Sequence, residues 1–181
     1  MSSSIINYTD IYSRFFLKVE GYDLFDEDMS DETRDALLCS WLHSSLAKPY
    51  VNRLFSSVIL IDPHQEEDSD TGEVTDVEGT IEYELKTKID EDFGDKNFII
   101  EVLAYGMGLC WIEPKLYSLT NILQFLGTSD EKLYSQANHI TALQSLRDEM
   151  IHTQRALIRD RGYSYNSYIN GTSASSNLRG D

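Results

Sequence analysis

The longest regular pattern in the sequence is a set of apolar residues near the C-terminus that recurs every three or four positions over about 30 residues. The set comprises Leu133, Ala137, Ile140, Leu143, Leu146, Met150 and Leu157. Such spacing places apolar side chains on one face of an α-helix. Ser129 is the predicted N-cap, and the helix is expected to end near Gly162. The chain must therefore fold around at least one long amphipathic helix.

A second long helix is predicted from Asp95, and its surface is nearly all apolar. Its apolar residues include Phe98, Ile99, Val102, Leu103, Met107, Cys110 and Trp111. A helix of this kind is buried, so it is the predicted central helix. Gly106 and Gly108 would each cost about 1 kcal/mol there relative to Ala, and close approach of another helix would explain them. Pro114 is expected to kink or restart the helix, which then runs to a stop at Gly127.

Shorter elements are predicted in the N-terminal half. One helix has Thr9 as its N-cap and Gly21 as its stop, and a second is capped by Ser30. Pro49 interrupts the second helix and begins a short new one. Residues 57–61 form a β-type run, and residues 81–89 alternate between apolar and charged side chains, as half-buried strands do.

Together the two β-type runs predict a hairpin whose long tip is the acidic segment 62–79. A lone hairpin is marginally stable in water, so it should pack on the helices or on a neighbouring subunit. The predicted fold class is therefore mainly α. We expect a compact helical bundle with a long C-terminal helix, one β-hairpin insertion at about 56–90 and an extended C-terminal arm.

The predicted domain ends at residue 162, and residues 163–181 form the arm. Three tyrosines and an isoleucine fall within seven residues, followed by a Gly/Ser/Asn-rich tail. Ordering a backbone residue costs about 1–2 kcal/mol, and this tail has little apolar surface to offset that cost. Tyrosine is a favoured interface anchor, so we expect the arm to dock on other subunits; packing on its own domain is the alternative. The candidate interface residues are Arg159, Arg161, Tyr163, Tyr165, Tyr168 and Ile169.

Composition restricts the function classes. The net charge of −16 argues against sequence-specific DNA binding, unless the basic residues gather on one face. Hydrophobic residues make up 41% of the chain, which argues against global disorder. No apolar run has transmembrane length, and the N-terminus lacks the basic flank and long apolar stretch of a secretory signal. We therefore expect no membrane insertion, with the cytoplasm as the default compartment.

Motifs for catalysis or ligand binding are missing from the sequence. GxSxG, the Walker loop and GxGxxG do not occur, and the acidic segment 66–73 does not keep the register of a calcium-binding EF-hand. Cys39 and Cys110 are predicted to be buried free thiols without a metal-spaced partner. The histidines, predicted to be structural or surface residues, are His43, His64, His139 and His152. We therefore expect a protein that is not an enzyme and uses no cofactor or metal.

Four blocks of the sequence resemble the small head-tail connector (adaptor) proteins of tailed bacteriophages. They are KPYVNRLFSS at 48–57, the segment 99–114 ending in WIEP, YSQANH at 134–139 and RDRGYSYNSY at 159–168, and the resemblance covers residues 8–170. It implies a structural virion protein that forms a ring, typically dodecameric, beneath the portal protein. The arm from residue 159 onward would dock on the portal. The opposite face would receive the downstream neck or tail-completion protein, and double-stranded DNA would pass through the channel.

The charge is compatible with this expectation, because carboxylates in the channel would repel phosphates within a Debye length, about 8 Å at physiological salt. The expected location is the virion neck, after assembly in the host cytoplasm. An acidic cytosolic module that binds a basic partner through residues 62–78 is the alternative. A metal-dependent hydrolase is the least favoured hypothesis, because no acid–base pair is placed on rigid elements.

Overall fold

The computed structural model describes residues 4–67, 74–90, 93–125 and 130–164, with only the backbone described at 121–125, 130–136 and 164. The chain is a mixed α/β structure that is 63% helical. Its described part contains five helices, a three-stranded antiparallel sheet and a separate two-stranded hairpin. The predicted predominance of helices is confirmed, while the sheet is larger than the single hairpin that the sequence indicated.

The N-terminal half begins with a strand that the sequence did not predict. Its elements are β1 (Ser4–Asn7), α1 (Tyr8–Lys18), α2 (Asp31–Ala47) and α3 (Pro49–Asn52). Ser30 caps α2 as predicted, since its side chain accepts a hydrogen bond from the backbone of Thr33. The predicted ends of α1 were wrong. Asn7, not Thr9, precedes the helix, and Gly21 lies beyond its end, in a turn with a φ of 86°.

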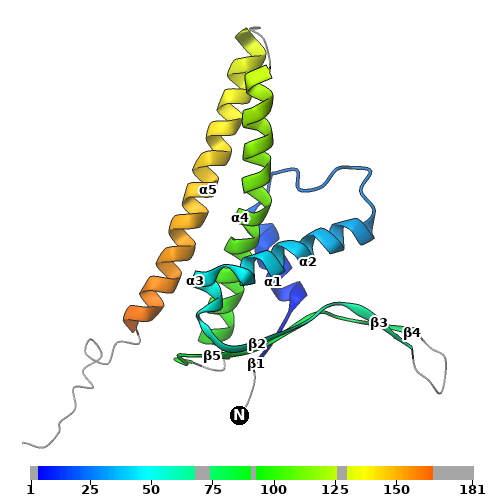
Figure 1. Ribbon diagram of the computed structural model, residues 1–181, viewed down its shortest axis with the longest axis vertical. Helices are drawn as coiled ribbons and strands as arrows, with labels where there is room; N and C mark the ends of the chain where they lie inside the picture. The colour runs from blue at the N-terminus through cyan, green and yellow to red at the C-terminus, as the bar shows by residue number, and fades with distance from the viewer. Residues whose placement is uncertain (1–3, 68–73, 91–92, 126–129, 165–181) are drawn as a thin grey trace, which may run out of the picture.

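The sheet pairs β5 (Thr80–Leu85) with two partners. The predicted hairpin is confirmed, because β2 (Phe55–Ile61) runs antiparallel to β5. On the other edge β1 adds the unpredicted strand, with Ile6 opposite Ile81. Beyond this sheet, β3 (His64–Glu67) and β4 (Val74–Val77) form a separate two-stranded antiparallel ribbon. Figure 1 shows this β3–β4 ribbon extending away from the helices.

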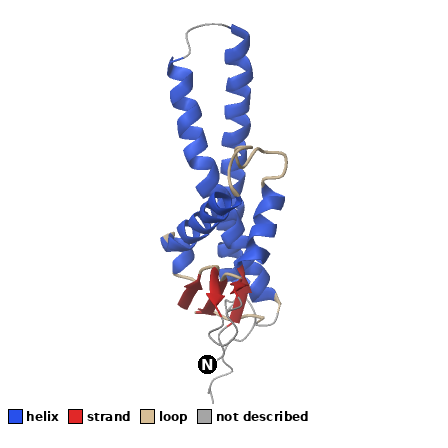
Figure 2. Cartoon of the chain, turned by 90° about the vertical axis from the view of Figure 1, so that its right-hand side faces the viewer, coloured by secondary structure: helices blue, strands red, loops and turns tan. Residues whose placement is uncertain are grey.

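Two long antiparallel helices dominate the structure. α4 (Gly94–Phe125) and α5 (Asp130–Ser164) pack along each other, and α1 and α2 cover the lower part of α4. The pair projects beyond the other helices, so the molecule is elongated and differs from the compact bundle that was predicted (Figures 1 and 2). α4 continues through Pro114 as one helix, so the predicted restart there was wrong. α5 runs to Ser164, close to its predicted end near Gly162.

The prediction of close helix approach at the two α4 glycines is confirmed. A Cβ atom added to Gly106 would lie 1.8 Å from Oγ of Ser45 on α2 and 3.0 Å from Nε2 of Gln154 on α5. Both polar side chains are fully buried. Ser45 donates to the carbonyl of Leu103, and Gln154 donates to the carbonyl of Val102. Gly108 meets the end of the Met150 side chain in the same way.

The interior of the molecule is centred on α4. Its buried side chains pack against α1, α2, α5 and the inner face of the sheet. The fully buried ones on α4 are Ile99, Val102, Leu103, Ala104, Met107 and Ile112. Cys39 and Cys110 are free thiols, but both are only partly buried, so the prediction of full burial was wrong. In the described part of the chain, no helix combines the length and apolarity needed to span a bilayer.

Candidate functional site

Three of the six predicted interface residues lie in the described part of the chain, at the end of α5. Arg159 and Tyr163 are exposed there, with 57% of the Tyr163 surface accessible. Arg161 points inward. Tyr165, Tyr168 and Ile169 lie outside the described residues, as does the rest of the predicted arm. The described part of α5 therefore includes the first two residues of the predicted arm, Tyr163 and Ser164.

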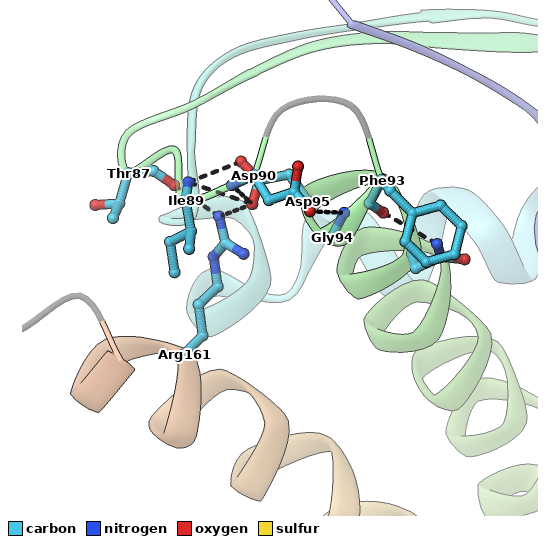
Figure 3. Close-up of polar contacts among 8 residues, drawn as sticks. Thr87, Ile89, Asp90, Phe93, Gly94, Asp95 and Arg161 are labelled. Carbon is cyan, nitrogen blue, oxygen red and sulfur yellow. Dashed lines mark hydrogen bonds and ion pairs between the residues drawn. The ribbon is translucent and has the colours of Figure 1, made fainter.

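Arg161 is held within its own chain by a buried ion pair (Figure 3). Its guanidinium lies 2.8 Å from Oδ1 of Asp95 and donates to the carbonyl of Thr87 at 2.7 Å. The Arg161 and Asp95 side chains are only 11% and 4% exposed. The guanidinium also stacks 4.4 Å from the ring centre of Phe98. The prediction that Arg161 contacts a partner therefore needs this side chain to leave an internal site.

Asp95 was predicted as an N-cap, but its carboxylate binds upstream backbone instead. It accepts hydrogen bonds from the N–H groups of Ile89 and Asp90, while Asp90 accepts one from Gly94 (Figure 3). We call Asp95, Arg161, Thr87, Ile89 and Asp90 the Asp95–Arg161 hub. It joins three segments: the residues after β5, the first turn of α4 and the last turns of α5. The hub thereby fixes the point from which the C-terminal segment departs.

Beside this hub, α3 and α5 form a groove rich in arginine. It has a volume of about 520 Å³ and is lined by Tyr50, Arg53, Arg155, Ile158, Arg159 and Gly162. All three arginines are exposed. Burial raises the pKa of Tyr50, while the charge of Arg155 acts to lower it. Arg159 pairs with its neighbour Asp160 at 3.1 Å. The three guanidinium groups gather positive charge around one hollow, on a chain that is otherwise strongly acidic.

The β3–β4 ribbon carries the opposite charge. Glu66, Glu67 and Asp76 are exposed on it, and its described residues include no lysine or arginine. Its root is tight, because a Cβ atom on Gly79 would lie 2.6 Å from the Tyr8 ring and 2.8 Å from Pro63. In Figure 1 the ribbon and the C-terminal end of α5 point to opposite sides of the molecule. The part of α5 that carries Arg155 and Arg159 of the groove therefore lies on the opposite side of the molecule from the acidic ribbon.

At the root of the ribbon, four polar side chains from distant segments converge. Sγ of Cys39 lies 3.6 Å from Nε2 of His43 and 3.4 Å from Oδ1 of Asp62. The Nε2 atom of His43 lies 2.8 Å from the same Asp62 oxygen, and the Tyr8 hydroxyl donates to it at 2.8 Å. We call Tyr8, Cys39, His43 and Asp62 the rim cluster. Within the described residues, its Cys, His and Asp are the group placed to share a metal ion.

The ionisation of the rim cluster follows from this convergence. Partial burial acts to raise the pKa of Asp62, but hydrogen bonds from Tyr8, His43 and Cys39 outweigh it, and the pKa is lowered overall. Burial, the hydrogen bond to Asp62 and that carboxylate's charge together raise the pKa of Cys39 to about 11. Burial and the bond to Asp62 also raise the pKa of Tyr8. The raised pKa values of Tyr8 and Cys39 favour their protonated forms, so both side chains donate to the Asp62 carboxylate.

The rim cluster lacks the arrangement of a Cys–His–Asp catalytic relay. In such a relay the carboxylate binds one ring nitrogen of the histidine and the nucleophile binds the other. Here Cys39 and Asp62 both face Nε2 of His43. The raised pKa of Cys39 also opposes formation of the reactive thiolate. Its sulfur, nitrogen and oxygen atoms all lie within 4.8 Å of one another, close enough to contact one metal ion.

Part of the rim cluster could have been found in the sequence. Cys39 and His43 are four positions apart in a helix that was predicted correctly, and this spacing places two side chains on one face. The pair does not belong to a standard zinc motif, and it was therefore not predicted. Asp62 had no such signal, because only the pairing of β2 with β5 brings it beside α2.

Comparisons with protein-family models, with curated proteins and with solved structures found no match for this chain.

Proposed function

We propose that this chain is a subunit of a head-tail connector (adaptor) ring of a tailed bacteriophage, located beneath the portal. The observation that carries the proposal is the placement of two surfaces of opposite charge on opposite sides of the molecule. The acidic ribbon projects on one side, and the end of α5 that carries Arg155 and Arg159 of the groove lies on the other. Among proteins that form rings, we propose a connector because residues 8–170 resemble connector proteins.

Two different, complementary surfaces on one subunit favour head-to-tail contacts. Such contacts generate a ring when the rotation between neighbours closes, as it does in cyclic oligomers. In our proposal the ribbon of one copy enters the arginine groove of the next. Exposed ion pairs add little affinity individually, about 0–1 kcal/mol. Several of them set orientation and exclude wrong partners, and contacts between the flanking segments supply the rest.

The C-terminal arm is proposed to bind the portal. It begins beside the Asp95–Arg161 hub, which holds the last turns of α5 against α4 and the segment after β5. Tyr163 is already exposed at this point. An arm anchored on a rigid base loses fewer degrees of freedom on docking than one on a flexible base, which improves its affinity. Arg159 would contribute to the ring contact, and Tyr163 with the following residues to the portal contact.

The proposed channel carries double-stranded DNA without sequence-specific binding. The net charge of −16 suits a lumen that must release its cargo. In this proposal the subunit performs no catalysis and needs no membrane. The ring would be dodecameric and would receive the downstream neck protein on its far face. Assembly would take place in the host cytoplasm and end in the virion neck.

The ring contact is tested by charge reversal. Arg155→Glu and Glu66→Lys should each weaken subunit association on portal rings by at least about tenfold, because like charges would then face each other. Combining both substitutions in every subunit should restore association. The matched control is Arg147→Glu, since Arg147 lies on the same helix outside the groove and pairs with the next residue, Asp148, as Arg159 does with Asp160. Native mass spectrometry would count the subunits bound.

The arm is tested separately by removing residues 163–181. We expect portal binding to be lost while the helical circular dichroism signal is kept. Unchanged portal binding would contradict the proposed role of the arm. If Arg147→Glu weakened association as much as Arg155→Glu, the groove would not be the contact.

A second function is favoured by the acidic ribbon alone, namely binding of a basic partner protein. In that case Glu66→Lys should weaken partner binding, whereas Arg155→Glu and removal of 163–181 should have no effect. Arg155→Glu in the groove and Glu66→Lys in the ribbon therefore distinguish the two functions, because only the ring proposal requires both surfaces.

A further inference from the structure

We propose that Cys39, His43 and Asp62 bind a divalent transition metal ion, with zinc as the best match, and that the ion fixes the root of the acidic ribbon. This inference does not depend on the connector function. It starts from the rim cluster, where three ligand types lie within contact distance of one another although they come from α2 and from the end of β2.

The distances agree with a tetrahedral site. Zinc bonds of about 2.3 Å to sulfur and 2.0–2.1 Å to nitrogen or oxygen imply edges of about 3.6 Å from sulfur to nitrogen and about 3.3 Å from nitrogen to oxygen. The observed Sγ–Nε2 and Sγ–Oδ1 distances are 3.6 and 3.4 Å. The Nε2–Oδ1 distance of 2.8 Å is that of a hydrogen bond. It must open by about half an ångström, which a half-exposed Asp62 side chain can accommodate.

The ligand chemistry selects the metal. Thiolate and imidazole favour zinc and other late divalent ions over calcium or magnesium, which require oxygen ligands. On binding, the ion takes the Nε2 lone pair of neutral His43, whose ring proton is then carried by Nδ1, and the Cys39 thiol releases its proton to solvent. Three protein ligands leave one coordination position open to water or to a group from another molecule. The ion would reach the site from the solvent side, where Asp62 is exposed.

Tyr8 completes the site as a positioning residue. Its hydroxyl donates to the Asp62 oxygen, and its ring is held by burial at the start of α1. Hydrogen-bond donors of this kind orient ligating carboxylates. Tyr8 also contacts the ribbon root directly, since its backbone N–H donates to the carbonyl of Gly79. A bound ion would therefore join α1, α2 and the root of the ribbon, and so fix the angle at which the ribbon projects.

The test uses Co²⁺ as a spectroscopic substitute for zinc, added to the full-length chain without an affinity tag. We expect one equivalent to produce a sulfur-to-cobalt charge-transfer band and the visible bands of tetrahedral Co²⁺, and zinc to displace them. Cys39→Ser should abolish the charge-transfer band. His43→Gln and Asp62→Asn should weaken binding by more than the roughly 10–100-fold that loss of a residue hydrogen-bonded to a ligand costs. The loss of Co²⁺ affinity in Tyr8→Phe should fall within that roughly 10–100-fold range.

Two variants serve as matched controls. Cys110→Ser removes the other free thiol, and His64→Gln removes an exposed histidine near the ribbon root. Both should bind Co²⁺ like the unmodified chain. A second readout is the melting temperature, which zinc should raise in the unmodified chain and in the controls but not in His43→Gln. Absence of the charge-transfer band in the unmodified chain, or its survival in Cys39→Ser, would overturn the proposal.

Discussion

The Asp95–Arg161 hub and the rim cluster are alike in chemistry and opposite in accessibility. Each gathers several hydrogen-bond donors around one carboxylate, and each joins segments far apart in the sequence. The Asp95 side chain is 4% exposed, whereas that of Asp62 is 52% exposed. The donors to Asp95 are two backbone N–H groups and a guanidinium, none of which is a metal ligand. Two side chains that bond to Asp62 can also be metal ligands: Cys39 after its thiol loses a proton, and His43 through the lone pair of Nε2.

The difference indicates what each cluster contributes. A buried, fully paired carboxylate resists any change in its partners, because an unpaired buried charge is costly. The hub is therefore a stability element that sets the geometry of the chain end. An exposed carboxylate tolerates exchange of its partners, because water can replace them. The rim cluster is therefore suited to a reversible ligand and contributes little stability without one.

The largest expected effect is loss of the buried ion pair. Arg161→Met should lower the free energy of unfolding by about 3–5 kcal/mol, because it leaves the Asp95 charge buried without its cation. Urea denaturation followed by circular dichroism would measure this change. The matched control is Arg159→Met on the same helix, whose side chain is 60% exposed and which should change stability by less than about 0.5 kcal/mol. Equal effects of the two substitutions would contradict the contrast between the hub and the surface.

A smaller effect is expected where polar side chains pack against the α4 backbone. Gly106→Ala should destabilise the chain by about 1–3 kcal/mol, because the new methyl group overlaps Ser45 and Gln154 in a region without free space. Gly162→Ala is the control, since nothing lies within 4 Å of its added Cβ and it should be neutral or stabilising by up to about 1 kcal/mol. A Gly106→Ala variant of unchanged stability would show that Ser45 and Gln154 can move aside. The buried contact would then tolerate change as the exposed rim cluster does.

Much of this architecture followed from local patterns in the sequence. Apolar periodicity predicted all four of the longer helices, and Ser30 and Pro49 marked helix starts correctly. The failures arose where distant contacts override local preference. Pro114 does not break α4, because the flanking residues Trp111, Ile112 and Leu116 are held by burial on both sides of it. β1 is too short to show a pattern and exists through its pairing with β5.

The candidate sites were predicted less completely than the fold. The sequence pointed to the end of α5, where Arg159 and Tyr163 are indeed exposed. It could not show that Arg161 turns inward, because its partner Asp95 lies 66 residues away along the chain. The arginine groove also depends on a distant contact, as it joins Arg53 of the turn after α3 to α5. Charge patterns along a sequence do not show which charges share a surface.

The smallest expected effect concerns Asp62 in the absence of metal. With a chelator present, Asp62→Asn should cost less than about 1 kcal/mol at pH 7, because the side chain is half exposed and water screens its interactions. The pKa of Asp62 is lowered in the folded chain, so the carboxylate stabilises the fold above the pKa of the unfolded chain, near 4, and this contribution is lost as the pH falls through the folded pKa. The stability difference between the two proteins should therefore shrink below about pH 4. Denaturation curves from pH 7 to pH 3 would measure this stability difference. A stability difference that widens on acidification would contradict the expectation. A loss of stability as large as that of Arg161→Met would remove the distinction between the exposed rim cluster and the buried hub.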